Sequence, residues 1–133
     1  MEELTYNAKI AVIKLLTEIL NADKIVHEKE LEYKNEIVSS FNLPVTYNHE
    51  VDSLITLQAL SIIRELPIAQ KEQVAKMMGK MIVCDNNINY NEVKLYNAFC
   101  ESCNIERDFK IDDYEGVSLS GPYVNPEDIM NNN

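Results

Sequence analysis

Glycine, proline and cysteine are scarce in this sequence of 133 residues, with three, four and three copies, and tryptophan is absent. A chain with few helix breakers and many Leu, Ile, Glu, Lys and Met residues favours helices. Three glycines leave no Gly-rich loop for phosphate binding. The three cysteines form no disulfide-rich pattern, which indicates a reducing compartment.

Basic residues are also few: 12 Lys and Arg face 22 Asp and Glu, so the formal net charge is −10. Phosphate backbones and anionic membrane surfaces repel such a field, which argues against a nucleic acid or a lipid surface as the partner. Divalent cations and proteins with a basic patch are compatible with it. The simplest interpretation is that the excess acid keeps a cytoplasmic protein soluble.

Long hydrophobic runs are missing as well. No stretch approaches the roughly 20 apolar residues of a membrane span. The N-terminus "MEELTYNAKI" is acidic where a signal peptide needs basic residues. We therefore expect a cytoplasmic protein without membrane insertion. A hydrophobic content of 46% in 133 residues predicts one globular domain with a substantial core.

Helical spacing of apolar residues runs through most of the chain, and no period-two pattern is long enough to compete with it. The clearest stripe recurs every three or four positions as Val51, Ile55, Ala59, Ile62 and Leu66. The prediction is an all-α, compact bundle of about five or more helices, over residues 5–21, 28–41, 49–65, 69–84 and 90–103.

The end of the chain differs in composition. Residues 108–133 hold two of the three glycines and two of the four prolines, and they end in asparagines. This composition predicts an irregular tail after a helical domain of residues 1–107. We expect the tail to pack on the bundle or on a neighbouring chain, and the second alternative leaves a homodimer open.

Oxygen-bearing side chains alternate along "CDNNINYNE", residues 84–92, as they do at the start of an EF-hand loop. A 12-residue calcium loop that begins at Asp85 needs Gly at its sixth position and Glu at its twelfth. The chain has Tyr90 and Tyr96 at these positions. The segment is therefore not an EF-hand loop.

Much of the same pattern occurs earlier as "ADKIVHEKE", residues 22–30, and a shift of 62 positions aligns the two copies without a gap. Each copy reads Asp, two residues, an aliphatic residue, three residues, Glu and then an amphipathic helix. The chain therefore contains two pseudo-repeated helix–acidic loop–helix units. The aligned pairs are Asp23 and Asp85, Val26 and Ile88, Glu30 and Glu92, Leu31 and Val93, Ile37 and Phe99, and Leu43 and Ile105.

The repeated motif has a structural interpretation. Asn89 suits the N-cap of a helix, and Glu92 three residues later suits a capping-box partner. His27 and Glu30 are the weaker version of the same device in the first copy. On this interpretation the motif starts helices and carries no chemistry.

The twice-repeated spacing D-x-x-[VI]-x-x-x-E after a helix resembles the tellurite-resistance TerB-like domains, which also occur at the N-terminus of DjlA-type DnaJ-like proteins. The resemblance covers about residues 5–107, and the glycine that the family has after each Asp is Lys24 and Asn86 here. It implies a compact helical domain with two acidic units. It also implies a cytoplasmic, bacterial stress-response or interaction module that is cation-responsive and without established catalytic activity.

Pseudo-twofold packing of the two units would bring four loop carboxylates together: Asp23, Glu30, Asp85 and Glu92. Four such groups in one place repel unless a divalent ion or a basic partner neutralises them. Ligands that are all oxygen would suit Mg²⁺, Ca²⁺ or Mn²⁺. The same four residues are thus candidate metal ligands and a candidate interaction surface for a basic protein patch.

The CxxC of Cys100 and Cys103 is not a redox motif, because it falls in the last turn of a predicted helix, where the helix dipole does not favour a thiolate. The first copy has Val38 and Phe41 at the equivalent positions, which predicts buried cysteines. A zinc site would need further ligands from Cys84, His27 or His49, whose spacing matches no recognised motif.

These observations favour a non-enzymatic interaction or regulatory module over an enzyme. The alternatives are a metal-dependent hydrolase-like enzyme that uses the same carboxylates, and a purely structural scaffold. An enzyme requires carboxylates within a few ångströms of one another in a pocket. An interaction surface requires only that they are exposed on one face, and a scaffold requires neither.

Overall fold

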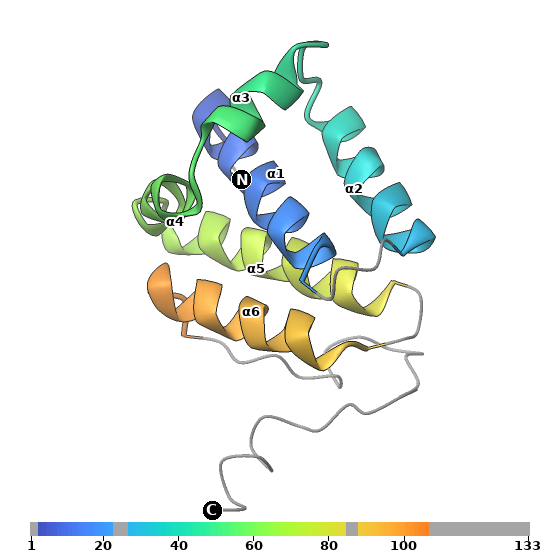
Figure 1. Ribbon diagram of the computed structural model, residues 1–133. Helices are drawn as coiled ribbons and strands as arrows, with labels where there is room; N and C mark the ends of the chain where they lie inside the picture. Colours follow the sequence, from blue (N-terminus) through green and yellow to red (C-terminus); the bar gives the residue numbers. More distant parts are fainter. Residues whose placement is uncertain (1–2, 23–26, 85–87, 107–133) are drawn as a thin grey trace, which may run out of the picture.

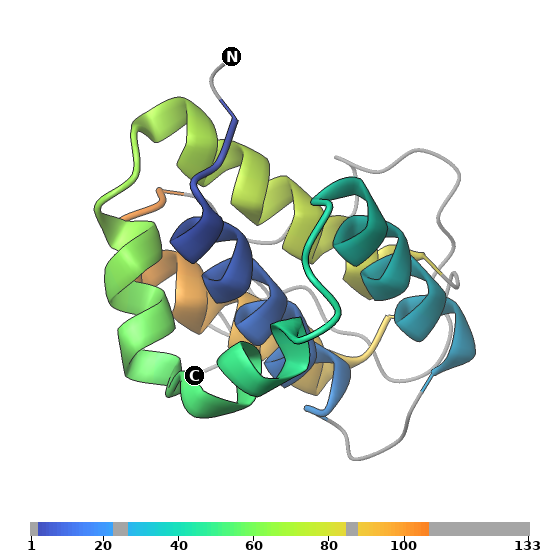
Figure 2. The ribbon, with the colours of Figure 1, turned by 90° about the horizontal axis from the view of Figure 1, so that it is seen from above.

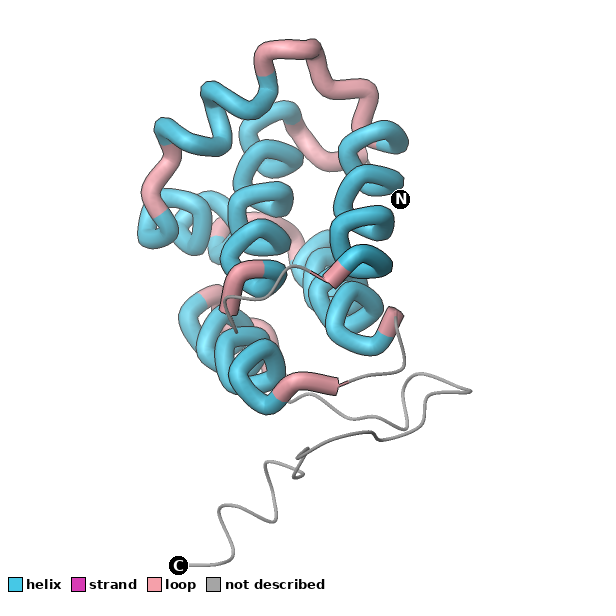
Figure 3. Tube along the Cα trace, turned by 45° about the vertical axis from the view of Figure 1, so that its right-hand side comes forward, coloured by secondary structure: helices cyan, strands magenta, loops and turns pink. Residues whose placement is uncertain are grey.

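The computed structural model describes residues 3–22, 27–84 and 88–106. These residues form six helices and no strand, so the predicted all-α bundle is confirmed (Figures 1 and 3). The predicted tail, residues 108–133, lies outside the described residues. The helices are α1 (Tyr6–Leu20), α2 (Glu28–Ser40), α3 (Tyr47–Ser53), α4 (Thr56–Arg64), α5 (Ile68–Val83) and α6 (Tyr90–Ser102).

Helix α1 is the central element of the bundle. It contacts each of the other five helices, and Figure 2 shows it between α4 and α2. Thr5 caps its start, with the Ala8 amide donating to Thr5 Oγ1 at 3.2 Å. Most of its residues are apolar and fully enclosed, which makes α1 the main source of the core. Its buried residues are Ala8, Ile10, Ala11, Val12, Ile13, Leu15, Leu16, Ile19 and Leu20.

The prediction of one helix over residues 49–65 is wrong, because the chain breaks there into α3 and α4. Leu54 has extended backbone angles, with φ −87° and ψ 125°, and Ile55 starts α4 with its amide donating to Gln58 Oε1 at 3.1 Å. The break changes which face is buried. Ala59, Leu60 and Ile63 are buried, whereas Ile55 is 57% exposed. The bend thus lets α4 pack its own apolar face against α1.

The repeat is visible in the helix boundaries. Helices α2 and α6 begin and end 62 positions apart, and α1 and α5 overlap in the same register. The N-caps His27 and Asn89 have nearly identical backbone angles, φ −95° and ψ 123° against φ −96° and ψ 129°. Both second helices end before an asparagine with positive φ, Asn42 at 53° and Asn104 at 59°. The two units therefore share their turns at both ends.

The contacts between the helices follow the pattern of a pseudo-twofold arrangement. Exchange of the two copies turns α1 into α5 and α2 into α6. Accordingly α1 contacts α2 as α5 contacts α6, and α1 contacts α6 as α5 contacts α2. Helices α3 and α4 connect the copies. In such an arrangement, equivalent residues meet only near the axis.

Among the residues that the structure describes, no helix combines the length and the apolar character needed to cross a membrane.

Candidate metal centre

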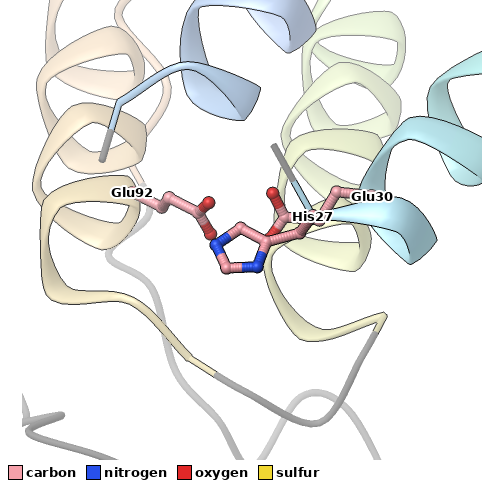
Figure 4. A group of neighbouring side chains, drawn as sticks. All are labelled: His27, Glu30 and Glu92. Carbon is pink, nitrogen blue, oxygen red and sulfur yellow. The ribbon is translucent and has the colours of Figure 1, made fainter. Parts of the chain in front are cut away.

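The starts of α2 and α6 bring three side chains together (Figure 4). His27 is the N-cap of α2, Glu30 lies in the first turn of α2, and Glu92 lies in the first turn of α6. One ligand atom from each residue lies within 4.8 Å of those from the other two. Glu30 and Glu92 are equivalent residues of the two copies, so the pseudo-repeat places the same carboxylate on both sides of the cluster.

Both carboxylates are enclosed by the protein. Glu30 is 1% exposed and Glu92 is 0% exposed, whereas His27 is partly exposed. A buried carboxylate is costly unless positive charge or hydrogen bonds compensate it, and two that lie this close also repel each other. A positive charge placed beside the two carboxylates offsets this repulsion.

The two equivalent N-cap residues, His27 and Asn89, differ in what their side chains contact. In the second copy the Asn89 side chain caps its helix, accepting from the amides of Asn91 at 2.8 Å and Glu92 at 3.3 Å. The equivalent His27 makes no such side-chain cap hydrogen bond to α2. Its ring instead lies beside Glu30 and Glu92 (Figure 4). The two copies use the same N-cap position for different tasks.

The four predicted site residues fall into two groups. The structure brings Glu30 and Glu92 together, and Asp23 and Asp85 lie outside the described residues. Sequence reasoning gave His27 a role in starting a helix, which is correct for its backbone, but missed its side chain. The donor set around the two glutamates therefore includes a nitrogen and is not all oxygen.

Burial changes the interpretation of the predicted interaction surface. A surface that recognises a basic patch must present its charges to solvent, and the side chains of Glu30 and Glu92 are enclosed. These two residues cannot supply an exposed recognition surface in this conformation. They are suited to bind an ion between the two copies.

In the described part of the chain, the group of possible metal ligands consists of His27, Glu30 and Glu92 and includes no cysteine. Cys100 and Cys103 are buried, as predicted, and the Cys103 thiol donates to the Leu60 carbonyl at 3.6 Å. Burial raises the pKa of Cys103 from 9.0 to about 11, although Lys71 and Arg64 act in the opposite direction. A thiol with this pKa remains protonated at neutral pH, so Cys103 is neither a nucleophile nor a ready metal ligand.

The comparisons with known proteins bear on the fold alone. No model of a known protein family matches the sequence, and no curated protein does. The fold is similar to the crystal structure of a protein of unknown function from Porphyromonas gingivalis, with a TM-score of 0.70 and 19% identity. The match covers 82% of this chain and 86% of that one. This bundle architecture therefore occurs in another protein.

Proposed function

We propose that this protein is a non-enzymatic interaction and regulatory module that responds to a divalent cation. The observation that carries the proposal is the convergence of His27, Glu30 and Glu92 from two helices, with their ligand atoms within 4.8 Å of one another. A dication would balance the two carboxylates and leave a site without net charge. This arrangement links cation binding to the contact between the two copies.

The cation would act mainly on α2, all of whose residues the structure describes. Glu30 is the one buried residue of this helix, and Leu31 is 36% exposed. The equivalent helix α6 buries Glu92, Val93, Tyr96, Phe99 and Cys100. Helix α2 therefore has less apolar burial than α6: Tyr33, Ile37 and Val38 are only partly buried against the core. Regions with less apolar burial open more readily. An ion bound by residues of α2 and α6 would fix α2 on the bundle.

Helix α2 also carries the acidic surface that we propose for a partner. Glu28, Glu32 and Glu36 recur every four positions, so they lie on one face of the helix, and all three are exposed. With a net charge of −10, the protein would attract a protein with a basic patch. We call these three residues the acidic stripe. Because His27 is the N-cap residue of this helix and Glu30 lies in its first turn, cation binding would hold the stripe in place.

The TerB-like character of the module remains part of the proposal. It is supported by the repeated D-x-x-[VI]-x-x-x-E motif. A cytoplasmic role in a bacterial stress response, such as tellurite resistance, would follow from that resemblance.

The hydrolase-like alternative has less support. A catalytic metal site needs a coordination position that its substrate can reach. Glu30 and Glu92 are 1% and 0% exposed, so a substrate would not reach their carboxylates in this conformation. A hollow of about 420 Å³ is present near the start of α5, but it is lined by other residues: Ile68, Lys71, Glu72, Asn104, Ile105 and Glu106.

Amide hydrogen exchange tests the proposal directly. The full chain, stripped with chelator, is compared with the same sample after addition of Mg²⁺, Ca²⁺, Mn²⁺ or Zn²⁺ in turn. We expect at least one of these ions to slow exchange in α2 more than in α1, because α1 is already fully packed. The double variant Glu30→Gln, Glu92→Gln should lose the effect, and the exposed control Glu32→Gln should keep it. If no ion changes exchange in α2 or the thermal midpoint, the proposal is wrong.

A second measurement tests the partner surface. Binding to an immobilised basic peptide should weaken when the acidic stripe is changed to Gln at all three positions. The control changes three exposed acids away from α2, Glu65, Glu72 and Glu101, and keeps the same net charge as the stripe variant. If both variants lose binding equally, the attraction depends on net charge and the stripe has no special role.

A further inference from the structure

The donor atoms of the cluster define a class of cation more narrowly than the charge does. His27 offers an imidazole nitrogen, and Glu30 and Glu92 offer carboxylate oxygens. Imidazole nitrogen suits Zn²⁺ and the neighbouring transition-metal ions, whereas Mg²⁺ and Ca²⁺ bind almost only oxygen. Ca²⁺ also takes six to eight oxygen ligands, and two carboxylates supply at most four.

We infer that the cluster of His27, Glu30 and Glu92 is a Zn²⁺-type transition-metal site that joins the two copies and discriminates against Mg²⁺ and Ca²⁺. The inference rests on the proposed cation response and makes it specific. Zn²⁺ is usually tetrahedral, so the three protein ligands leave one position, which a water molecule can fill without giving a substrate access to the buried carboxylates. His27 is the partly exposed member of the cluster, so we expect the water to reach the ion beside it.

The difference between the two N-caps supports this inference independently of the acidic residues. Asparagine is among the best N-cap residues, and histidine is not one of them. The second copy has the good cap, Asn89, whose side chain binds two amides of α6. The first copy has His27, whose side chain does not cap and lies instead beside the carboxylates of both copies. The side chain of His27 thus does not cap its helix, and its ring supplies a nitrogen donor that Asn89 cannot offer in the second copy.

The same comparison provides the variant that tests the inference. His27→Asn puts the capping residue of the second copy into the first, where the backbone angles are nearly the same. The variant should therefore fold at least as well as the wild type without metal, while it lacks the imidazole. His49 is the other of the two histidines and is exposed, so His49→Asn is the matched control.

The experiment titrates the metal-free full chain with Zn²⁺, Mg²⁺ and Ca²⁺ by calorimetry, for the wild type and both variants. We expect Zn²⁺ to bind the wild type at least about tenfold more tightly than Mg²⁺ or Ca²⁺. His27→Asn should weaken Zn²⁺ binding by at least about tenfold. Even the loss of a residue that only contacts a metal ligand lowers metal affinity by roughly 10–100-fold. His49→Asn should bind like the wild type.

Nuclear magnetic resonance of the histidine side chains identifies the ligand. With two histidines in the chain, Zn²⁺ should shift the ring nitrogens of His27 and leave those of His49 in place. Zn²⁺ held by Cys84 would leave the His27 signals unmoved and would overturn the inference. Equal binding of Zn²⁺, Mg²⁺ and Ca²⁺, unaffected by His27→Asn, would also overturn it, although the cation response would stand. Failure of every ion to bind would overturn both.

Discussion

Asn42 and Asn104 lie 62 positions apart and adopt the same left-handed backbone, with φ 53° and 59°. Each follows the second helix of its copy, at the point where the chain must turn away. Asparagine tolerates this conformation better than other residues with a Cβ, apart from a few small polar ones. Because the same residue makes the same turn twice, the duplication extends to the backbone conformation that ends each unit.

These two asparagines should respond to substitution in a predictable way. Asn42→Gly should leave the free energy of unfolding within about 0.5 kcal/mol of the wild type, because glycine adopts positive φ without steric cost. Asn42→Val should lower it by about 1–2 kcal/mol, the cost of a left-handed backbone for a residue with a branched Cβ. Urea unfolding measures both.

Asn104 offers a contrast within the same test. Its amide can be oriented so that the oxygen accepts from Arg64 Nη2 at 3.2 Å and from Nε at 3.3 Å. Asn104→Gly should therefore lower stability more than Asn42→Gly does, since it removes these bonds. Valine variants that are as stable as the wild type at both positions would contradict the shared-turn interpretation.

Removal of one buried carboxylate should stabilise the protein when no metal is bound. Ligand atoms of Glu30 and Glu92 lie within 4.8 Å of each other. Two unit charges at about this distance repel by about 3 kcal/mol at an effective dielectric constant of about 20. Glu92→Gln keeps the shape of the side chain and removes one charge. We therefore expect it to raise the free energy of unfolding of the metal-free protein by about 1–3 kcal/mol. The same variant should lose its stabilisation by metal. Chemical denaturation with and without chelator measures both effects.

The control for this prediction is Glu101→Gln, an exposed acid on the same helix as Glu92. It should change stability by no more than about 0.5 kcal/mol, because solvent screens its charge. A large loss of stability in Glu92→Gln without metal would show that the carboxylate is already compensated within the protein.

The fold could be predicted from the sequence wherever one local pattern decided the structure. Helical periodicity located α1, α2, α5 and α6 to within one or two residues, and the shift of 62 positions aligned their ends. It failed between Val51 and Leu66, where the apolar stripe continues through a break at Leu54 and Ile55. The stripe reflects only the spacing of apolar residues, and this spacing does not reveal that α4 packs on α1 as a separate helix.

The site could be predicted in part for a related reason. Repetition identified Glu30 and Glu92 as equivalent, and pseudo-twofold packing was enough to suggest that they meet. His27 was missed because the repeat has asparagine at the equivalent position, so the alignment could not reveal a residue whose task differs between copies. The difference between the copies was itself the clue in the sequence: the first copy has a histidine at the N-cap position where the second copy has a strong capping residue.

The central position of α1 predicts where the stability of the bundle resides. Leu16 is 0% exposed in the middle of this helix, and Leu16→Ala should lower the free energy of unfolding by about 2–5 kcal/mol. Leu57, near the start of α4, is 74% exposed, and Leu57→Ala should change it by no more than about 0.5 kcal/mol. Urea unfolding of both variants measures the difference, and equal effects would contradict the placement of the core around α1.

The raised pKa of Cys103 predicts how stability depends on pH in alkaline solution. Burial moves the pKa of this thiol from 9.0 to about 11 in the folded protein, so the folded state favours the protonated form. The contribution to stability is fully present below about pH 9 and is lost as the pH rises towards about 11, because the unfolded chain releases its proton first. Denaturant midpoints measured across this range should fall as the pH rises.

Other groups titrate in the same range, so a variant must isolate the thiol. Cys103→Val keeps an apolar side chain at this buried position and removes the proton that is released. Its denaturant midpoint should therefore fall less steeply between about pH 9 and 11 than that of the wild type. Alkylation gives a second measurement: the half-buried Cys84 should react with iodoacetamide well before Cys103 in the folded protein. If Cys103 reacts first, or if the variant has the same pH profile as the wild type, the thiol is not enclosed in the way that the structure describes.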